Sequence, residues 1–267
     1  MRKDLRTQAR ETVAGTKSGA DSARRALEML FAFTENKPSA SVRDLAETLD
    51  IPVPSVHRYV AMLREMGLLE EGTRGRYHLT MRVAALARAA RQATPLVDLA
   101  EPYMRRLAEQ IGEAVLLIRM VGGQPVCSHR VESPGRFRLS FEPGQSLPLL
   151  RGASIRLLLG PMTPTQRENY VDSAIQSGAQ PPLHGRERFL REVERDLKRG
   201  WSVSNEEIDE GVWAPAAAVY EDGNVVATLS APCPLFRMDD QRRNLVIDTV
   251  RKASADLSNA LDPGFSS

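Results

Sequence analysis

Cysteine, aromatic residues and long apolar runs are all scarce in this chain. Its 267 residues include two cysteines, and aromatic residues make up 5% of the sequence. Cys127 and Cys233 lie far apart, without a C-x-x-C spacing or a histidine cluster, so the sequence predicts no disulfide framework and no metal site. We expect two buried, inert thiols and no cofactor.

The apolar stretches are too short to cross a bilayer. Runs such as 114–118 and 157–159 fall far short of the roughly 20 residues that a spanning helix needs. Residues 1–19 carry charges but lack the apolar centre and the small-residue cleavage site of a secretory signal. The sequence therefore predicts a cytoplasmic protein without a membrane partner.

The composition that remains is typical of a globular protein, with an uneven charge. Charged residues make up 26% and hydrophobic residues 42%, and the length favours two domains. Residues 1–91 hold 16 Lys and Arg against 11 Asp and Glu, a net charge of +5, whereas residues 92–267 hold 20 against 23, a net charge of −3. A basic N-terminal part fits a polyanionic partner, although a solvated basic face would look similar.

The N-terminal third has the pattern of a helix-turn-helix. Apolar residues at helical spacing predict helices over about 21–35, 42–49 and 54–66. Ser41 and Asp44 have the spacing of a capping box at the start of the second helix. Two short helices joined by a tight turn, with a stabilising helix before them, make a helix-turn-helix.

The exposed side of the third helix is small or hydrogen-bonding at its N-terminal end. Once the inward positions are removed, Pro54, Ser55, His57 and Arg58 point outward. Side chains of this kind at the start of a helix are typical of a recognition helix that meets base edges in the major groove.

A hairpin follows the third helix. Residues 68–70 and 76–79 alternate as two strands around 72–75, which places Arg74 and Arg76 at the hairpin tip. This is the pattern of a wing. The alternative is a three-helix interaction module that carries a hairpin of no special function.

We predict ten DNA-binding residues from the helix starts, the recognition helix and the wing. They are Arg24, Arg25, Ser41, Arg43, Pro54, Ser55, His57, Arg58, Arg74 and Arg76. The arginines and hydroxyls are expected to bind phosphate, and the first turn of the third helix to carry sequence information.

An Ala- and Arg-rich stretch over 81–93 has strong helix propensity and predicts a linker helix. Its stripe of Val83, Leu86, Ala87 and Ala90 could pack against a second copy, which would supply the two-fold symmetry that pseudo-palindromic operators require. A spacer packed on its own domain is the alternative.

The remainder of the chain reads as an α+β domain. Strands are predicted over 114–121, 125–131, 138–141, 201–204, 213–219 and 225–230, and helices from about 99 to 111 and over 153–160, 164–177, 186–199 and 239–261. This order predicts an antiparallel sheet with helices on one face, which leaves the other face for loops and a pocket.

Candidate catalytic residues are few. Cys127 and His129 are two apart on a predicted strand, so their side chains should share a face and could meet, but nothing near them suggests a third partner. His184 is the other candidate base, and the acidic run over 206–210 is predicted to be a solvated loop rim. No recognisable catalytic motif appears, and we expect no enzyme.

Several stretches together resemble the IclR family of bacterial regulators, from Asp21 to Leu261. They are DSARRALEML, LAETLDIPVPSVHRYVAMLREMGLLE, GRYHLT, RVESPGRFRLSFEPGQSLPL, RGWSVSNEEIDEGV and VVATLSAP. The resemblance implies a winged helix-turn-helix, a linker helix and a GAF-like effector-binding domain with an antiparallel sheet. It also implies dimers or dimers of dimers on double-stranded operator DNA and a small organic-acid effector, often aromatic.

The resemblance also implies an effector site, with departures from the family pattern. By position it comprises Leu150, Arg151, Gly152, Ala153, Ser154, Ser204, Asn205, Ala214, Thr228 and Ser230. Family members commonly carry P-L-H-A-T/S-A-x-G-K/R where this chain has 148–156, so the histidine is replaced by Leu150. Arg151 suits a carboxylate, unless it is a surface arginine at a helix start.

These expectations combine into one hypothesis, a ligand-responsive transcriptional regulator. Residues 1–20 are expected to be a flexible tail, 21–80 the DNA-binding domain, 81–95 the linker helix and 96–262 the effector-binding domain. A protein-interaction adaptor and a catalytic GAF-like domain are the alternatives, since a fold of this kind does not fix function.

Overall fold

The computed structural model describes residues 20–34, 37–92, 95–132 and 141–262. Contacts divide the chain into two compact units, residues 1–93 and 94–267. Each unit has its own hydrophobic core. Within the described residues, no helix is long and apolar enough to cross a membrane.

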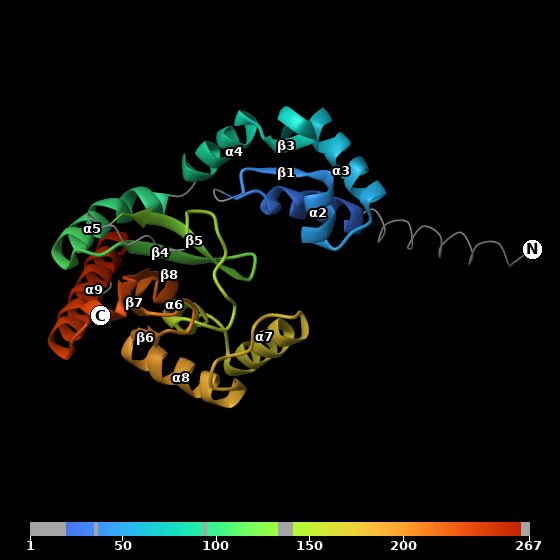
Figure 1. The fold of residues 1–267 in the computed structure, drawn as a ribbon. Helices are drawn as coiled ribbons and strands as arrows, with labels where there is room; N and C mark the ends of the chain where they lie inside the picture. Colours follow the sequence, from blue (N-terminus) through green and yellow to red (C-terminus); the bar gives the residue numbers. More distant parts are fainter. Residues whose placement is uncertain (1–19, 35–36, 93–94, 133–140, 263–267) are drawn as a thin grey trace, which may run out of the picture. The chain divides into compact units, whose positions relative to one another are not determined.

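The N-terminal unit is a small helical domain with a three-stranded sheet (Figure 1). Residues 20–28 are helical and lead into η1 (Met29–Ala32), followed by β1 (Ser39–Ser41), α2 (Val42–Leu49), α3 (Val53–Glu65), β2 (Leu69–Glu71), η2 (Thr73–Gly75), β3 (Arg76–Leu79) and α4 (Met81–Gln92). The strand order is β1-β3-β2, with antiparallel pairs. The predicted helix-turn-helix and hairpin are confirmed.

Local signals explain where these helices begin and end. The Ser41 side chain accepts a hydrogen bond from the Asp44 N–H, and Asp44 accepts one from the Ser41 N–H, which is the predicted capping box. Asp50 then turns the chain in the left-handed conformation, with φ +49°. Strand β1 was not predicted, because three residues are too short for the alternation that marks a strand.

Helix α4 occupies most of the predicted linker. Val83 packs against the core of the N-terminal unit, whereas Leu86 is 60% exposed and Met81 77% exposed. One side of the helix thus packs on its own domain, and another side leaves apolar side chains exposed to solvent.

The C-terminal unit is built around an antiparallel sheet. Its elements are α5 (Pro95–Ile111), β4 (Val115–Val121), β5 (Gln124–Val131), α6 (Ala153–Leu158), α7 (Pro164–Gln176), α8 (Arg186–Arg199), β6 (Trp201–Asn205), β7 (Val212–Glu221), β8 (Asn224–Ser230), β9 (Cys233–Pro234), η3 (Leu235–Arg237) and α9 (Asp240–Leu261). The strands lie in the order β5-β4-β8-β7-β6, and β9 pairs with β7. This confirms the α+β fold.

Helices cover both faces of this sheet, so the prediction of helices on one face is wrong (Figure 1). On one face α5 and α9 pack against side chains such as Leu117 and Leu229. On the other, α6 packs against Ala216 and Ala218, and α8 contacts α6 and β6. Successive residues of a strand point to opposite faces, and here both sets are buried.

An irregularity in β5 overturns the expectation that Cys127 and His129 share a face. Leu117 pairs with His129 but Ile118 pairs with Cys127, so Ser128 is an extra residue in the ladder. Cys127 packs in the cluster that contains Ile118, whereas the His129 ring pairs with Glu101 on α5. The thiol and the imidazole are therefore held apart. Of the strand predicted over 138–141, residues 138–140 lie outside the described residues, and Phe141 is not in a strand.

Candidate functional site

The exposed face of α3 is formed by the residues that do not enter the core. Val56, Tyr59, Val60 and Leu63 are buried, since they recur at helical spacing toward the other two helices. The same spacing leaves Pro54, His57 and Arg58 exposed and Ser55 half-buried.

Two of the ten predicted DNA-binding residues are already engaged within the protein. The Ser41 hydroxyl caps α2, as described above. Arg76 pairs with Asp44 at 3.1 Å and donates to the Ser39 carbonyl at 2.6 Å, which ties β3 to β1 and α2. Arg76 therefore holds the wing on the helical core, a role that its place in the hairpin did not reveal.

The other predicted arginines project from the surface. Arg24, Arg25 and Arg43 are exposed. Arg74 is exposed at the wing tip, where its φ of +59° places it in a tight turn. With Arg58, five of the predicted DNA-binding arginines are exposed.

A cavity lies in the C-terminal unit where α6 begins above one end of the sheet. Its empty volume is about 560 Å³, including the part that is open to solvent. Most of its wall is apolar, with Leu116, Ile118, Phe141, Leu147 and Val212 among the lining residues. An apolar wall with a few polar groups is typical of a small-molecule site.

Seven of the ten predicted effector-site residues line this cavity, and three do not. Those that line it are Arg151, Gly152, Ala153, Ser154, Ser204, Ala214 and Ser230. Leu150 instead packs in a cluster with residues of α7 and α8, Asn205 is exposed at the end of β6, and Thr228 is fully buried away from the lining.

The polar groups of the cavity differ in their hydrogen bonding. The Ser154 hydroxyl is buried and has no partner among the described residues. The Ser230 hydroxyl donates to the Pro215 carbonyl at 3.1 Å, and Arg151 donates through Nε to the Pro181 carbonyl at 2.9 Å. A buried hydroxyl without a partner costs free energy, so Ser154 is suited to bind a ligand atom.

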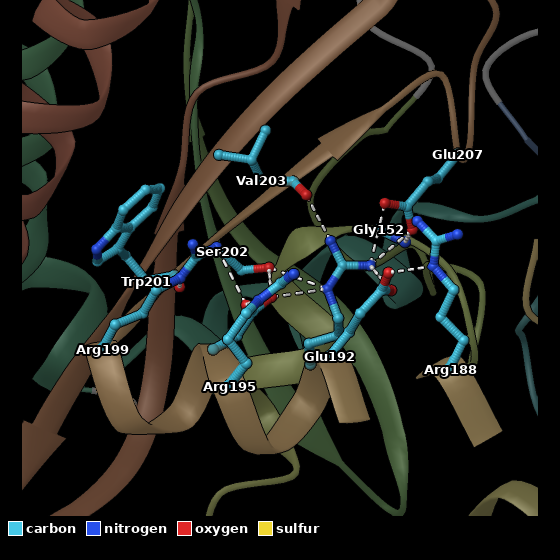
Figure 2. A network of polar contacts seen from close by, with 11 residues as sticks. Gly152, Arg188, Glu192, Arg195, Arg199, Trp201, Ser202, Val203 and Glu207 are labelled. Carbon is cyan, nitrogen blue, oxygen red and sulfur yellow. Dashed lines mark hydrogen bonds and ion pairs between the residues drawn. The ribbon is translucent and has the colours of Figure 1, made fainter. Parts of the chain in front are cut away.

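Figure 2 shows a network of polar contacts that includes Gly152, Ser202 and Glu207, and a buried arginine, Arg156, lies at its centre. Arg156 is 2% exposed and donates through Nε to Asp196 at 3.0 Å and to Ser202 at 3.0 Å. Its Nη1 donates to both carboxylate oxygens of Glu207, at 3.0 and 2.8 Å, and its Nη2 to the Val203 carbonyl at 2.6 Å. A buried charge needs partners of this kind.

Burial opposes the charged form of Arg156, but its partners outweigh that effect. The hydrogen bond to Glu207 and the charges of Glu207, Asp196 and Glu192 raise the pKa of the guanidinium above its ordinary value. The side chain is therefore a permanent cation that joins α6 to α8, β6 and the loop after β6.

The acidic run over 206–210 is not only a solvated loop rim. The Glu207 side chain is 14% exposed and bound to Arg156, and Asp209 lines the cavity. The prediction failed because the partner of Glu207 lies 51 positions earlier in the chain. The one available signal was Arg156 itself, which ends the stretch that resembles the family motif.

The two cysteines are buried and unreactive, as predicted. Burial raises the pKa of both the Cys127 and the Cys233 thiol to about 12, so neither forms a thiolate near neutral pH. The part of the chain that the structure describes also holds no cluster of three His, Cys, Asp or Glu side chains that could bind a metal ion.

Family models match both units. Residues 22–72 match the IclR helix-turn-helix domain, and residues 88–259 match the C-terminal domain of the bacterial transcriptional regulator IclR. The chain belongs to the IclR family. It is therefore a helix-turn-helix transcriptional regulator.

Curated relatives from two bacteria cover most of the chain. The HTH-type transcriptional regulator KipR of Bacillus subtilis is 26% identical over 231 residues, which is 85% of this chain and 91% of the relative. The HTH-type transcriptional repressor AllR of Escherichia coli is 27% identical over 249 residues, which is 91% of each chain.

Solved structures of IclR regulators have the same fold. One from Silicibacter has a TM-score of 0.74 at 19% identity and covers 92% of this chain and all of that chain. An IclR homologue from Microbacterium hydrocarbonoxydans, solved in complex with 4-hydroxybenzoate, has a TM-score of 0.73 at 21% identity and covers 91% of this chain and all of that chain.

Proposed function

We propose that this IclR regulator binds double-stranded operator DNA through α3 and the wing, and that a small organic acid in the cavity at α6 changes its operator affinity. The observation that supports this most strongly is the pairing of an exposed, basic helix-turn-helix face with a largely apolar cavity in the other unit. The protein is proposed to act in the cytoplasm as a repressor or an activator.

The proposal divides the chain by role. Residues 21–80 bind DNA, 81–95 connect the units, and 96–262 bind the effector, with 1–20 as a tail. The uncovered apolar side chains of α4, Leu86 above all, support self-association as a dimer or a dimer of dimers. A dimer would present two recognition helices to the two halves of a pseudo-palindromic operator.

Arg151 and the apolar lining favour an organic acid, possibly an aromatic one. The guanidinium of Arg151 provides positive charge at the wall, and the neighbouring residues offer a surface for a ring or a short chain. The 4-hydroxybenzoate complex of the Microbacterium homologue is consistent with a ligand of this class.

Regulation follows from differential binding. An effector that binds one arrangement of the two units better than another shifts the population toward it, and with it the affinity for DNA. Helix α4 is the segment through which that shift is proposed to pass.

A thermal-shift screen of aromatic and short-chain carboxylic acids tests the effector half of this proposal. An acid that binds should raise the melting temperature, by an amount that grows with the logarithm of its concentration over its Kd, and should change the affinity for a fragment of the protein's own upstream DNA. Arg151→Ala should lower the affinity for that acid by about tenfold or more, because a charge-assisted hydrogen bond contributes about 1.5–3 kcal/mol. The proposal is wrong if acids that bind leave the affinity for DNA unchanged.

A further inference from the structure

The loop after β6 forms one wall of the cavity. We call residues 206–211 the strap. Ile208 and Asp209 line the cavity, and Glu206 accepts a hydrogen bond from the Gly211 N–H at 2.8 Å, which closes the strap on itself. Glu206 and Gly211 both have positive φ, +54° and +73°, so the chain turns sharply at each end of the strap.

Glu207 fixes the strap by accepting hydrogen bonds from two groups, the Gly152 N–H and the Arg156 guanidinium. Its Oε2 accepts from the Gly152 N–H at 3.0 Å, and both of its oxygens accept from Nη1 of Arg156 (Figure 2). Gly152 itself lines the cavity. The Glu207 carboxylate is thus already bound to a backbone N–H and to a buried cation beside the ligand site.

Close packing at Gly152 shows how tightly the strap is seated. A Cβ atom at Gly152 would lie 2.7 Å from Cδ1 of Ile208, so a larger residue here would require the Ile208 side chain to shift, and the φ of +98° at Gly152 also favours glycine. A ligand group that binds the Gly152 N–H must displace the Glu207 carboxylate, which occupies this donor.

Arg156 keeps a charged partner without Glu207. Nε of Arg156 still pairs with the fully buried Asp196 at 3.0 Å, and Nη2 of Arg156 still donates to the Val203 carbonyl. The departure of Glu207 would free the Gly152 N–H, which lines the cavity, and Nη1 of Arg156, which lies behind it, without leaving the buried guanidinium unpaired.

A polar cleft next to the strap can receive the displaced side chain. Arg156 and Glu207 already line it, and the other charged or titratable side chains there are His184, Arg188, Arg195, Glu192 and Glu206. Outside the cavity, Glu207 would share Arg188 and Arg195 with Glu192 and Asp196, the carboxylates that these arginines already pair with.

We propose that Glu207 is a built-in competitor of the effector and sets which ligands the cavity accepts. A ligand carboxylate takes over the Gly152 N–H and the Nη1 of Arg156, and Glu207 turns into the neighbouring cleft, which releases the strap. The carboxylate of an acid must displace the Glu207 carboxylate, whereas a neutral ligand leaves Glu207 in place. This inference rests on the proposed function, since it concerns the same cavity.

The test compares Glu207→Gln with the wild-type full chain by calorimetry, using benzoate and its neutral analogue benzamide as probes. An amide competes more weakly for charged donors than a carboxylate does, so the benzoate-to-benzamide affinity ratio should rise about tenfold or more in the variant. Glu210→Gln, an exposed residue of the same strap, is the matched control and should leave the ratio unchanged. A ratio that does not rise, including benzoate that binds neither protein, overturns the inference.

Hydrogen exchange of the ligand-free proteins provides a second readout. Glu207→Gln should speed amide exchange in peptides that cover 150–158 and 204–213, relative to wild type and to Glu210→Gln. Unchanged exchange in both segments would also overturn the inference.

The two proposals can fail separately. If Glu207→Gln shows the higher ratio but no acid alters DNA affinity, the competitor role stands and the regulatory proposal fails. If an acid alters DNA affinity in the wild type but the ratio does not respond to Glu207→Gln, the regulation stands and the competitor role fails.

Discussion

Replacing Arg156 with methionine should lower the free energy of unfolding of the C-terminal unit by about 3 kcal/mol. Methionine fills much of the same space but cannot donate hydrogen bonds. The change leaves Oδ2 of Asp196, which is fully buried, with the Ser202 hydroxyl but without its cation, and it leaves Glu207 without the cation that holds it. Arg195 and Arg199 still reach Oδ1 of Asp196, which keeps the loss near the lower end of the usual 3–5 kcal/mol.

Chemical unfolding monitored by the two tryptophans measures this effect, because Trp201 and Trp213 both lie in the C-terminal unit. Arg188→Met is the matched control, since its ion pair with Glu192 involves an arginine side chain that is 57% exposed and should contribute less than about 1 kcal/mol. If Arg156→Met unfolds at the same denaturant concentration as wild type, the Arg156 network does not stabilise the fold in the way described.

Operator affinity should fall on the order of 10³-fold or more when salt is raised from 50 to 200 mM. Five of the arginines predicted to bind DNA are exposed on each copy, Arg24, Arg25, Arg43, Arg58 and Arg74, whereas Arg76 is held by Asp44. A dimer that uses six or more of the resulting cations on phosphates would release enough counterions for a loss of this size. Electrophoretic or fluorescence titrations of the upstream fragment at several salt concentrations give the slope.

Arg58→Ala and Arg64→Ala separate DNA recognition from helix stability. Both residues are exposed on α3, but Arg64 pairs with Glu71 at 3.2 Å and lies at the other end of the helix. Arg58→Ala should cost about 1–3 kcal/mol of operator binding, with little loss on unrelated DNA if the side chain reads a base. Equal effects of the two variants, or binding that ignores salt, would contradict the assignment of this surface.

The sequence predicted the N-terminal fold well because its signals are local. Helical spacing, the Ser41 capping box and Gly67 predicted the helices to within a residue or two of the observed α2 and α3. The three-residue strand β1 escaped, since its only distinguishing feature is a partner in β3, 35 or more positions further on.

In the C-terminal unit, the errors arose where distant residues decide the outcome. One extra residue in β5 moved His129 to the opposite face from Cys127, and nothing within β5 itself marks that position. Likewise, nothing within the acidic run indicates that Glu207 binds Arg156, which lies 51 positions earlier in the chain. The candidate cavity was better predicted, because the family motif places its residues at the start of α6.

Leu150 shows the limit of transferring a motif by position. It stands where relatives commonly have a histidine, but its side chain is 1% exposed and packs with α7 and α8. Arg151 and Ser154, its neighbours, do line the cavity, so the chemistry of the site depends on them.

Calorimetric titration of the bound acid, with and without saturating operator DNA, tests the central claim most directly. If effector and operator are coupled, DNA must change the affinity for the acid by the same factor by which the acid changes the affinity for DNA, and factors of about 5–150 are typical. We predict such a reciprocal change. An affinity for the acid that is the same with and without operator would contradict the account, because the cavity and the helix-turn-helix would then be independent.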